Sequence, residues 1–222
     1  MRKLILFFFA FIASTQLFAS SYVLVSASES DAKISVNGKD LGTGSLKVKV
    51  PSESCVTVRI SKPGFMKYEQ TYCSKKGTAR PPKSQFFDMK KDDSEEASTK
   101  TDQANVDFSV EVKKSLNATD AWKLATQIVT DYFDAIEVSD KETSYMRTAW
   151  VVQSFTQNTV RTRFIIKLGN SSPLTFKIKL VSEASGEQGT SSKSDEKFRD
   201  WDRVLRKYSN VISDFQTRLG NK

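Results

Sequence analysis

The chain has 222 residues, two Cys, no His and a formal net charge of +8 from 34 Lys and Arg against 26 Asp and Glu. The absence of His excludes Ser-His and Cys-His nucleophiles, imidazole zinc sites and haem with a proximal His, and two Cys cannot supply a four-thiolate metal site. A hydrophobic content of 38% with 15 Phe supports packed cores, and the length predicts one large or two small domains. We expect no enzymatic activity, no metal and no cofactor.

The first twenty residues predict export. Arg2 and Lys3 precede an apolar run over residues 4–13, and Leu17-Phe18-Ala19 ends in a small residue suited to cleavage. The run is too short to cross a hydrocarbon core of ~30 Å, which takes about 20 residues. We expect a cleaved signal peptide over residues 1–19 and a soluble periplasmic or secreted chain with no transmembrane span; a retained N-terminal anchor is the alternative.

Charge divides the rest of the chain into three segments. Residues 22–91 carry 13 cationic and 6 anionic side chains, residues 92–106 carry 1 and 5, and residues 107–222 carry 18 and 15. Residues 92–106 also lack apolar periodicity, which predicts an acidic, flexible linker between two modules. Because the basic excess lies in the N-terminal module of an exported chain, we expect an envelope protein or an anionic surface component as partner, and no nucleic acid.

The N-terminal module is predicted to consist of short strands and turns. Asn37-Gly38 between two strand-like stretches is typical of a two-residue hairpin turn. Alternating apolar and polar side chains over residues 46–50 and 56–60 indicate strands with one buried face. A turn at Lys62-Pro63-Gly64-Phe65 precedes a further strand over residues 67–73.

The turn at Gly64 predicts a strand register. If Gly64 lies at the centre of an antiparallel hairpin, opposed residues have numbers that sum to 128. This rule pairs Cys55 with Cys73, Thr57 with Thr71 and Arg59 with Glu69. Directly opposed Cys lie within disulfide range, and an exported chain favours a closed bridge. Two free thiols with a redox role are the alternative.

Three stretches of this module carry a family resemblance: SESDAKISVNGKDLG over residues 28–42, Val50-Pro51, and KPGFMKY over residues 62–68. They resemble the opening, the strand-ending Pro and the Lys-Pro-Gly-aromatic turn of the PEGA domain, over about residues 22–91. The sequence departs from the family where Ala32 alone remains of the Pro-Glu-Gly-Ala stretch and where Gly44-Ser45 replaces Thr-Pro. The resemblance implies a small β-sandwich that serves as a non-catalytic interaction or spacer module of cell-surface and envelope proteins.

Three residues near the tip of this hairpin are candidate partner contacts: Phe65, Met66 and Tyr68. Packing into the core is the alternative for at least one of them.

The C-terminal module, residues 107–222, shows the order β-α-β-β-β-α. A strand over residues 108–112 is followed by capping residues at Asn117 to Asp120 and by an apolar stripe at helical spacing up to Ile136. Alternating runs over residues 145–155, 159–168 and 174–181 indicate three strands. Apolar residues spaced by three and four predict a long last helix capped by Ser194: Phe198, Trp201, Leu205, Tyr208, Ile212, Phe215 and Leu219. This stripe is expected to pack on the sheet, with a coiled coil to a partner as the alternative.

This order of elements predicts an α+β fold of helix-grip type, an antiparallel sheet curved around the long C-terminal helix. SYMRTAWV over residues 144–151 and Arg161-Thr162-Arg163-Phe164 resemble the BamC-type helix-grip domains of envelope lipoproteins. The resemblance covers about residues 107–222 and consists of the element order with a loose Arg-Thr-x-Trp and Arg-x-Arg pattern. The chain departs from those lipoproteins in having no lipidation Cys, which argues against membrane anchoring.

The period-two phasing of these strands predicts a cationic sheet face. One phase points into the core and includes Met146, Thr148, Trp150 and Val152. The opposite face carries six candidate partner-binding residues: Arg147, Arg161, Arg163, Lys167, Lys177 and Lys179. Because the three strands place no carboxylate on this face, we predict that it binds an anionic partner through bidentate arginines. An ordinary solvated face neutralised by Asp107 and Glu111 is the alternative.

Together these patterns favour an exported, non-enzymatic binding or scaffolding protein of the bacterial cell envelope. No spacing singles out a pair of carboxylates or a Lys-Ser pair, so we assign no catalytic residue. The alternative is a small-ligand-binding protein that uses the groove between the curved sheet and the last helix, and a secreted hydrolase without His is a third interpretation. A filled aromatic core beneath the last helix would favour docking, and an open cavity there would favour a ligand.

Overall fold

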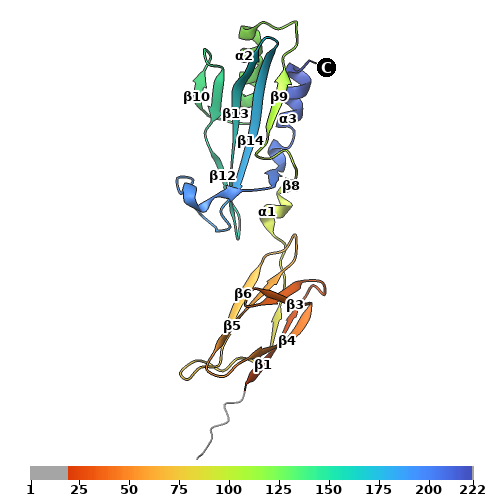
Figure 1. Cartoon of the computed structure of the whole chain (residues 1–222), viewed down its shortest axis with the longest axis vertical. Coiled ribbons are helices and arrows are strands. Elements are labelled where there is room, and N and C mark those ends of the chain that lie inside the picture. Colours follow the sequence, from red (N-terminus) through yellow and green to blue (C-terminus); the bar gives the residue numbers. More distant parts are fainter. Residues whose placement is uncertain (1–19, 222) are drawn as a thin grey trace, which may run out of the picture. The chain divides into compact units, whose positions relative to one another are not determined.

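The computed structural model describes residues 20–221, and its contacts divide the chain after Lys90 into two compact units. Both units are rich in strands (Figure 1), in agreement with the predicted sheet-rich fold. The predicted signal peptide, residues 1–19, lies outside the described residues. Within residues 20–221, no helix has the length and apolar character needed to cross a membrane.

Two sheets share one core in the N-terminal unit. The first has the order β4-β1-β7 and the second the order β3-β2-β5-β6. Their strands are β1 (Ser21–Ala27), β2 (Lys33–Val36), β3 (Lys39–Thr43), β4 (Ser45–Val50), β5 (Cys55–Ser61), β6 (Tyr68–Cys73) and β7 (Ser84–Phe87). Val23 and Val25 of the first sheet and Ile34, Val58 and Ile60 of the second are almost completely buried in a single cluster. The alternating pattern of the sequence therefore sets the inner face of each sheet.

Two tight turns connect neighbouring strands of the second sheet. Asn37 and Gly38 both have positive φ, at 49° and 81°, as the tight turn between β2 and β3 requires. Gly64, with φ of 82°, lies in the turn between β5 and β6. The predicted register is confirmed: the structure pairs Cys55 with Cys73, Thr57 with Thr71 and Arg59 with Glu69.

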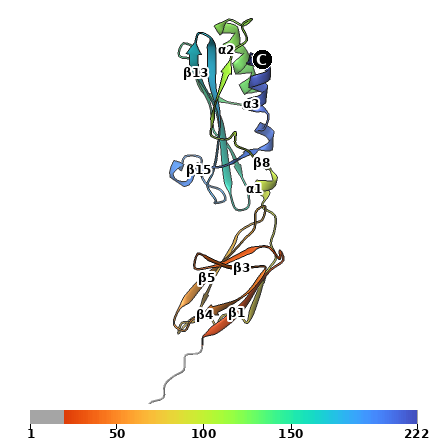
Figure 2. The same ribbon diagram turned by 45° about the vertical axis from the view of Figure 1, so that its right-hand side comes forward.

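The C-terminal unit is built on a seven-stranded antiparallel sheet. Its path is β10-β11-β13-β14-β15, with β12 also paired to β13 and β9 to β14. The strands are β9 (Asp107–Glu111), β10 (Ile136–Asp140), β11 (Tyr145–Thr148), β12 (Val151–Ser154), β13 (Thr159–Ser171), β14 (Leu174–Ala184) and β15 (Arg199–Asp200). Helices α2 (Ala118–Thr130) and α3 (Val211–Asp214) lie on one side of this sheet (Figures 1 and 2). Asn117 caps α2 as predicted, its side-chain oxygen accepting from the Asp120 amide at 2.9 Å.

Aromatic rings fill the space between this sheet and the two helices. The rings of Phe133 and Tyr208 stack with centroids 4.7 Å apart, and those of Phe164 and Phe215 stack at 5.0 Å. All four side chains are almost completely buried. The core beneath α3 is therefore packed with side chains.

The predicted long last helix is wrong, although its apolar stripe is buried. Residues 195–219 form a 3₁₀ turn, the short strands β15 and β16 (Arg203–Leu205), a second 3₁₀ turn, the one-turn α3 and a π-helical turn over Phe215–Leu219. The backbone of this segment pairs with other strands: the Trp201 amide donates to the Ser182 carbonyl at 2.9 Å, and β15 pairs with the end of β14. Tertiary hydrogen bonds thus override the helical spacing, and no helix-grip arrangement around a long helix is formed.

The prediction of a flexible linker over residues 92–106 is also wrong, because this segment folds as part of the C-terminal unit. It contains α1 (Asp93–Glu96), capped by the Asp92 side chain, and β8 (Ser98–Lys100), which pairs with β16. The Asn105 side chain exchanges two hydrogen bonds of 2.9 Å with the Ser182 backbone. Its acidic side chains contribute to this order, because Asp92 caps α1 and Asp93 accepts hydrogen bonds from Thr156.

Tyr132, just after α2, makes the stability of the C-terminal unit fall with rising pH in the alkaline range. Its hydroxyl donates to Asp214 Oδ2 at 2.6 Å, and burial together with this carboxylate raises the pKa of Tyr132 to about 12. The unfolded chain deprotonates near pH 10, so stability contributed by Tyr132 is complete below about pH 10 and is lost as the pH rises towards about 12. The free energy of unfolding, measured with urea and Trp fluorescence, should fall more steeply over this pH range in the wild type than in Tyr132→Phe. Equal slopes would contradict the assignment.

Candidate binding surface

The strand register places all six predicted cations on one face of the C-terminal sheet. Arg147 of β11 lies opposite Ile165 of β13, and Lys179 of β14 lies opposite the same Ile165. Lys167 lies directly opposite Lys177. We call this surface, which includes Arg161 and Arg163, the cationic face; it is turned away from the aromatic core.

Arg161 is a structural residue of this face. Its side chain is only 4% exposed, and its Nε donates to Glu183 Oε2 at 2.7 Å. Its Nη1 donates to the Ser192 carbonyl at 2.7 Å and to Asp195 Oδ1 at 2.5 Å. With its hydrogen bonds satisfied inside the protein, this guanidinium holds the segment before β15 against the sheet and has little capacity left for a partner.

Two further cations are neutralised by carboxylates of neighbouring strands. Arg147 Nε lies 3.1 Å from Glu137 Oε2, and Lys179 Nζ lies 3.7 Å from Asp107 Oδ1. Sequence reasoning anticipated Asp107 but missed Glu183, which continues the alternation of β14 two residues beyond the predicted end of that strand. The signal was present in the sequence, because the same alternation continues from the predicted end of the strand at residue 181 to Glu183.

Arg163 keeps unused binding capacity. It is half-buried, its Nε is buried without a hydrogen-bond partner, and its guanidinium carbon lies 4.0 Å from the centroid of the Trp150 ring. Burial lowers the pKa of Arg163, and the neighbouring charge of Arg147 lowers it further. An anion that hydrogen-bonded to the Nη groups would favour the charged form and offset both effects, while the buried Nε lies out of its reach.

Lys167 and Lys177 add uncompensated charge on the same two strands, four residues along from the pair of Arg163 with Val181. Both are exposed and directly opposed across β13 and β14. Like charges at opposed positions repel, and neither lysine forms an ion pair within the described part of the chain. These three side chains are therefore the part of the cationic face that remains open to an anionic partner.

Trp150 lies on the cationic face, although the phasing predicted it in the core. The run over residues 145–155 breaks between β11 and β12 at Ala149 and Trp150, which shifts the phase by one residue. Val151 therefore pairs with the inward Thr162, while Val152 pairs with Arg161 and is 41% exposed. The sequence does not reveal the break, because apolar residues occupy both phases of this run.

The Trp150 ring lies close to both arginines. The guanidinium carbons of Arg161 and Arg163 lie 4.2 and 4.0 Å from its centroid, and the guanidinium carbon of Arg161 also lies 4.1 Å from the centroid of the Phe198 ring.

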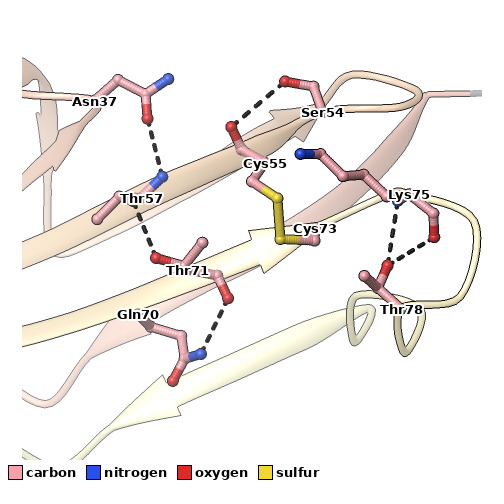
Figure 3. Close-up of a disulfide and its surroundings, with 9 residues drawn as sticks. All are labelled: Asn37, Ser54, Cys55, Thr57, Gln70, Thr71, Cys73, Lys75 and Thr78. Carbon is pink, nitrogen blue, oxygen red and sulfur yellow. Dashed lines mark hydrogen bonds between the residues drawn. A yellow bond between two sulfur atoms is a disulfide. The ribbon is translucent and has the colours of Figure 1, made fainter.

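In the N-terminal unit, the predicted disulfide joins β5 to β6. Cys55 and Cys73 are bonded (Figure 3), which excludes the alternative of free thiols in this structure. In the next cross-strand pair on the same face, the hydroxyls of Thr57 and Thr71 lie 3.0 Å apart. The hairpin is thus closed covalently at the end away from its turn.

The predicted contacts at the hairpin tip take part in packing. Phe65 and Tyr68 pack against the core of the N-terminal unit, and the Tyr68 hydroxyl donates to the Asp88 carbonyl at 2.9 Å. The Tyr68 and Phe87 ring centroids lie 5.8 Å apart. Met66 is half-buried, and its amide donates to the Lys90 carbonyl. The packing alternative therefore describes Phe65 and Tyr68 better than a role in partner contact.

One family model, described as the PEGA domain, matches residues 20–79 and confirms the resemblance of the N-terminal unit to that family. The folded unit continues beyond the match, because β7 pairs with β1 and Met89 is buried in the same core. No curated protein matches the chain. The resemblance of residues 107–222 to BamC-type domains stays a prediction. Within residues 20–221, no group of three or more Cys, Asp or Glu side chains is placed to hold a metal ion.

Proposed function

We propose that this chain is an exported binding or scaffolding protein of the bacterial cell envelope that acts through surface contacts and catalyses no reaction. The PEGA match supports an interaction or spacer role for the N-terminal unit, and disulfides such as Cys55–Cys73 persist mainly in oxidising compartments. The signal-like pattern of residues 1–19 supports export to the periplasm or beyond.

The observation that carries this proposal is the unsatisfied Arg163 on the cationic face. An arginine fork matches a carboxylate or phosphate bidentately, and an adjacent indole ring offers a flat apolar surface beside it. Lys167 and Lys177 extend the positive field along the same strands. We assign this site to an anionic group of an envelope protein or surface component.

Arg161 prepares the site for binding. Its ion pairs with Glu183 and Asp195 fix the guanidinium against Trp150, so the indole ring on which Arg163 stacks is held in place before a partner arrives. A site held in advance loses less conformational entropy when it binds. The two arginines therefore have separate tasks, one in structure and one in recognition.

The filled core favours docking on this outer face over a small ligand in the groove. Phe133, Phe164, Phe215 and Tyr208 occupy the space between the sheet and the helices. A ligand at that position would have to displace aromatic packing, so the small-ligand alternative receives no support there.

Photo-crosslinking tests the cationic face. A photo-reactive residue at the exposed position Val152 should give a discrete adduct with an envelope component in cells. Arg163→Glu with Lys177→Glu should reduce the yield by about tenfold or more, because it removes both attractive charges and adds repulsion. The exposed pair Lys114→Glu with Lys123→Glu carries the same charge change on the side of the sheet that α2 covers, so it is the matched control and should retain the adduct. Equal yields from the two double variants, or no adduct at all, would contradict the proposal.

A further inference from the structure

The outward face of the first sheet in the N-terminal unit carries apolar side chains that no described element covers. On β1, Tyr22 and Leu24 alternate with the buried Val23 and Val25. Across β4, Tyr22 lies opposite Lys49, and Leu24 lies opposite Lys47. On the other side of β1, Phe86 of β7 lies beside Ser26. We call this surface, formed by Tyr22, Leu24, Lys47, Lys49 and Phe86, the Tyr-Lys face.

Much of the exposed apolar surface of the chain's described part lies on this face. Leu24 is 46% exposed, Tyr22 is 48% exposed and Phe86 is 62% exposed. These are three of the seven large hydrophobic residues exposed in the described part of the chain, and they share the outward face of a single three-stranded sheet. Isolated exposed apolar residues are ordinary, whereas a contiguous group indicates a contact surface.

The charges on this face are of one sign. The other outward positions of the three strands are Ser26, Ser45 and Ser84, so the face carries no carboxylate. Neither Lys47 nor Lys49 forms an ion pair with a described residue, and Lys47 Nζ lies 4.8 Å from the Tyr22 ring centroid. Residues 22–91 as a whole carry 13 cationic and 6 anionic side chains.

We propose that the Tyr-Lys face docks reversibly on a bilayer that contains anionic phospholipid. Lysines at such a surface pair with lipid phosphates, Tyr favours the headgroup level, and Leu and Phe enter the boundary of the acyl chains. A second copy of the chain fits less well, because two-fold contact of this face with itself would bring four lysines together without a carboxylate. This surface is distinct from the cationic face of the C-terminal unit and does not depend on it.

Sedimentation with lipid vesicles tests the apolar part of the proposal. The exported chain should bind vesicles that contain phosphatidylglycerol and should not bind vesicles of phosphatidylcholine alone. Leu24→Ser with Phe86→Ser should weaken binding by about tenfold or more, because it removes the apolar area that enters the bilayer. Leu41→Ser with Leu168→Ser is the matched control, since Leu41 of β3 is 57% exposed and Leu168 of β13 is also exposed. All four positions lie on the surface, so circular dichroism should show folded protein throughout.

A second pair of variants tests the charge. Lys47→Gln with Lys49→Gln should weaken binding by about 25-fold, because each lysine near an anionic surface contributes about fivefold. Lys33→Gln with Lys39→Gln removes the same charge from exposed positions of the second sheet and should change binding much less. Added salt should weaken the binding of the wild type.

Four outcomes would overturn the proposal. The first is no binding to phosphatidylglycerol vesicles, and the second is equal loss in a test pair and its control. The third is a dimer that Leu24→Ser with Phe86→Ser abolishes, which would show that a second copy covers the face. The fourth is vesicle binding that is retained in both test pairs of the Tyr-Lys face but is lost in Arg163→Glu with Lys177→Glu. That result would assign the lipid contact to the cationic face.

Discussion

Arg161→Ala should lower the free energy of unfolding of the C-terminal unit by about 3–5 kcal/mol, the usual cost of removing one partner from a buried ion pair. The side chain is 4% exposed, and its loss leaves Glu183, itself largely buried, without a counter-charge. It also releases Asp195 and the Ser192 carbonyl, and it opens a space between the Trp150 and Phe198 rings.

The matched control for this prediction is Arg163→Ala, two residues along the same strand. Arg163 stacks on the same Trp150 ring but forms no ion pair with a described residue, so its replacement should cost about 1 kcal/mol or less. Urea unfolding followed by circular dichroism gives both values. A cost for Arg161→Ala no larger than that for Arg163→Ala would show that Arg161 does not have the structural role assigned to it.

Cys55→Ser with Cys73→Ser should destabilise the N-terminal unit by about 3 kcal/mol, since the bond closes a loop with a sequence separation of 18. A unit of this size buries a modest core, so this loss is a large share of its total stability. Amide hydrogen exchange in β5 and β6 measures the effect on this unit alone. Exchange in β13 and β14 of the C-terminal unit should stay unchanged.

Thr57→Ala with Thr71→Ala provides the comparison for the disulfide. It removes the next cross-strand contact on the same face, a hydroxyl pair at 3.0 Å, and leaves the covalent link in place. The expected cost is about 1 kcal/mol, that of one exposed hydrogen bond. The entropic account of the disulfide would be wrong if the serine pair and the alanine pair had equal effects on exchange.

The N-terminal unit was predictable because short-range signals determine much of it. Asn37-Gly38 and Gly64 mark turns. The turn at Gly64 fixes the register along the whole of β5 and β6, whereas the turn at Asn37-Gly38 fixes only the first two pairs of β2 and β3 before a bulge at Ile34 shifts the register. From the turn at Gly64, counting outward is enough to reach the pairing of Cys55 with Cys73. The parallel pairing of β7 with β1 was not predicted, because its residues lie about 60 positions apart and no turn links them.

The C-terminal unit shows why the rest was not predictable. β8 and β16 pair across more than 100 residues, and Arg203 of β16 donates to Ser98 Oγ of β8 at 2.8 Å. The sequence around Ser98 indicates a linker and that around Arg203 indicates a helix, and both segments become strands only because each supplies the other's hydrogen bonds. This pairing, together with the hydrogen bonds that Asn105 and Trp201 make to the Ser182 backbone, explains both errors.

The candidate binding surface was partly predictable for the same reason. The sequence predicts that the six cations share one face, because side chains alternate between the two faces along each strand and this needs no long-range information. Which cations remain open depends on carboxylates from other strands and turns, such as Glu137 and Asp195. The outward position of Trp150 depends on a break between β11 and β12 that no turn residue marks.

The central claim is that the chain leaves the cytosol and acts by surface contact, and the intact mass of the protein from native cells tests its premise most directly. The envelope fraction is treated with a thiol-alkylating reagent without prior reduction, so one mass reports both the N-terminus and the state of Cys55 and Cys73. The account predicts a chain that begins near Ser20 and carries no alkyl group. A cytosolic chain that retains Met1 and is alkylated on both Cys would contradict it.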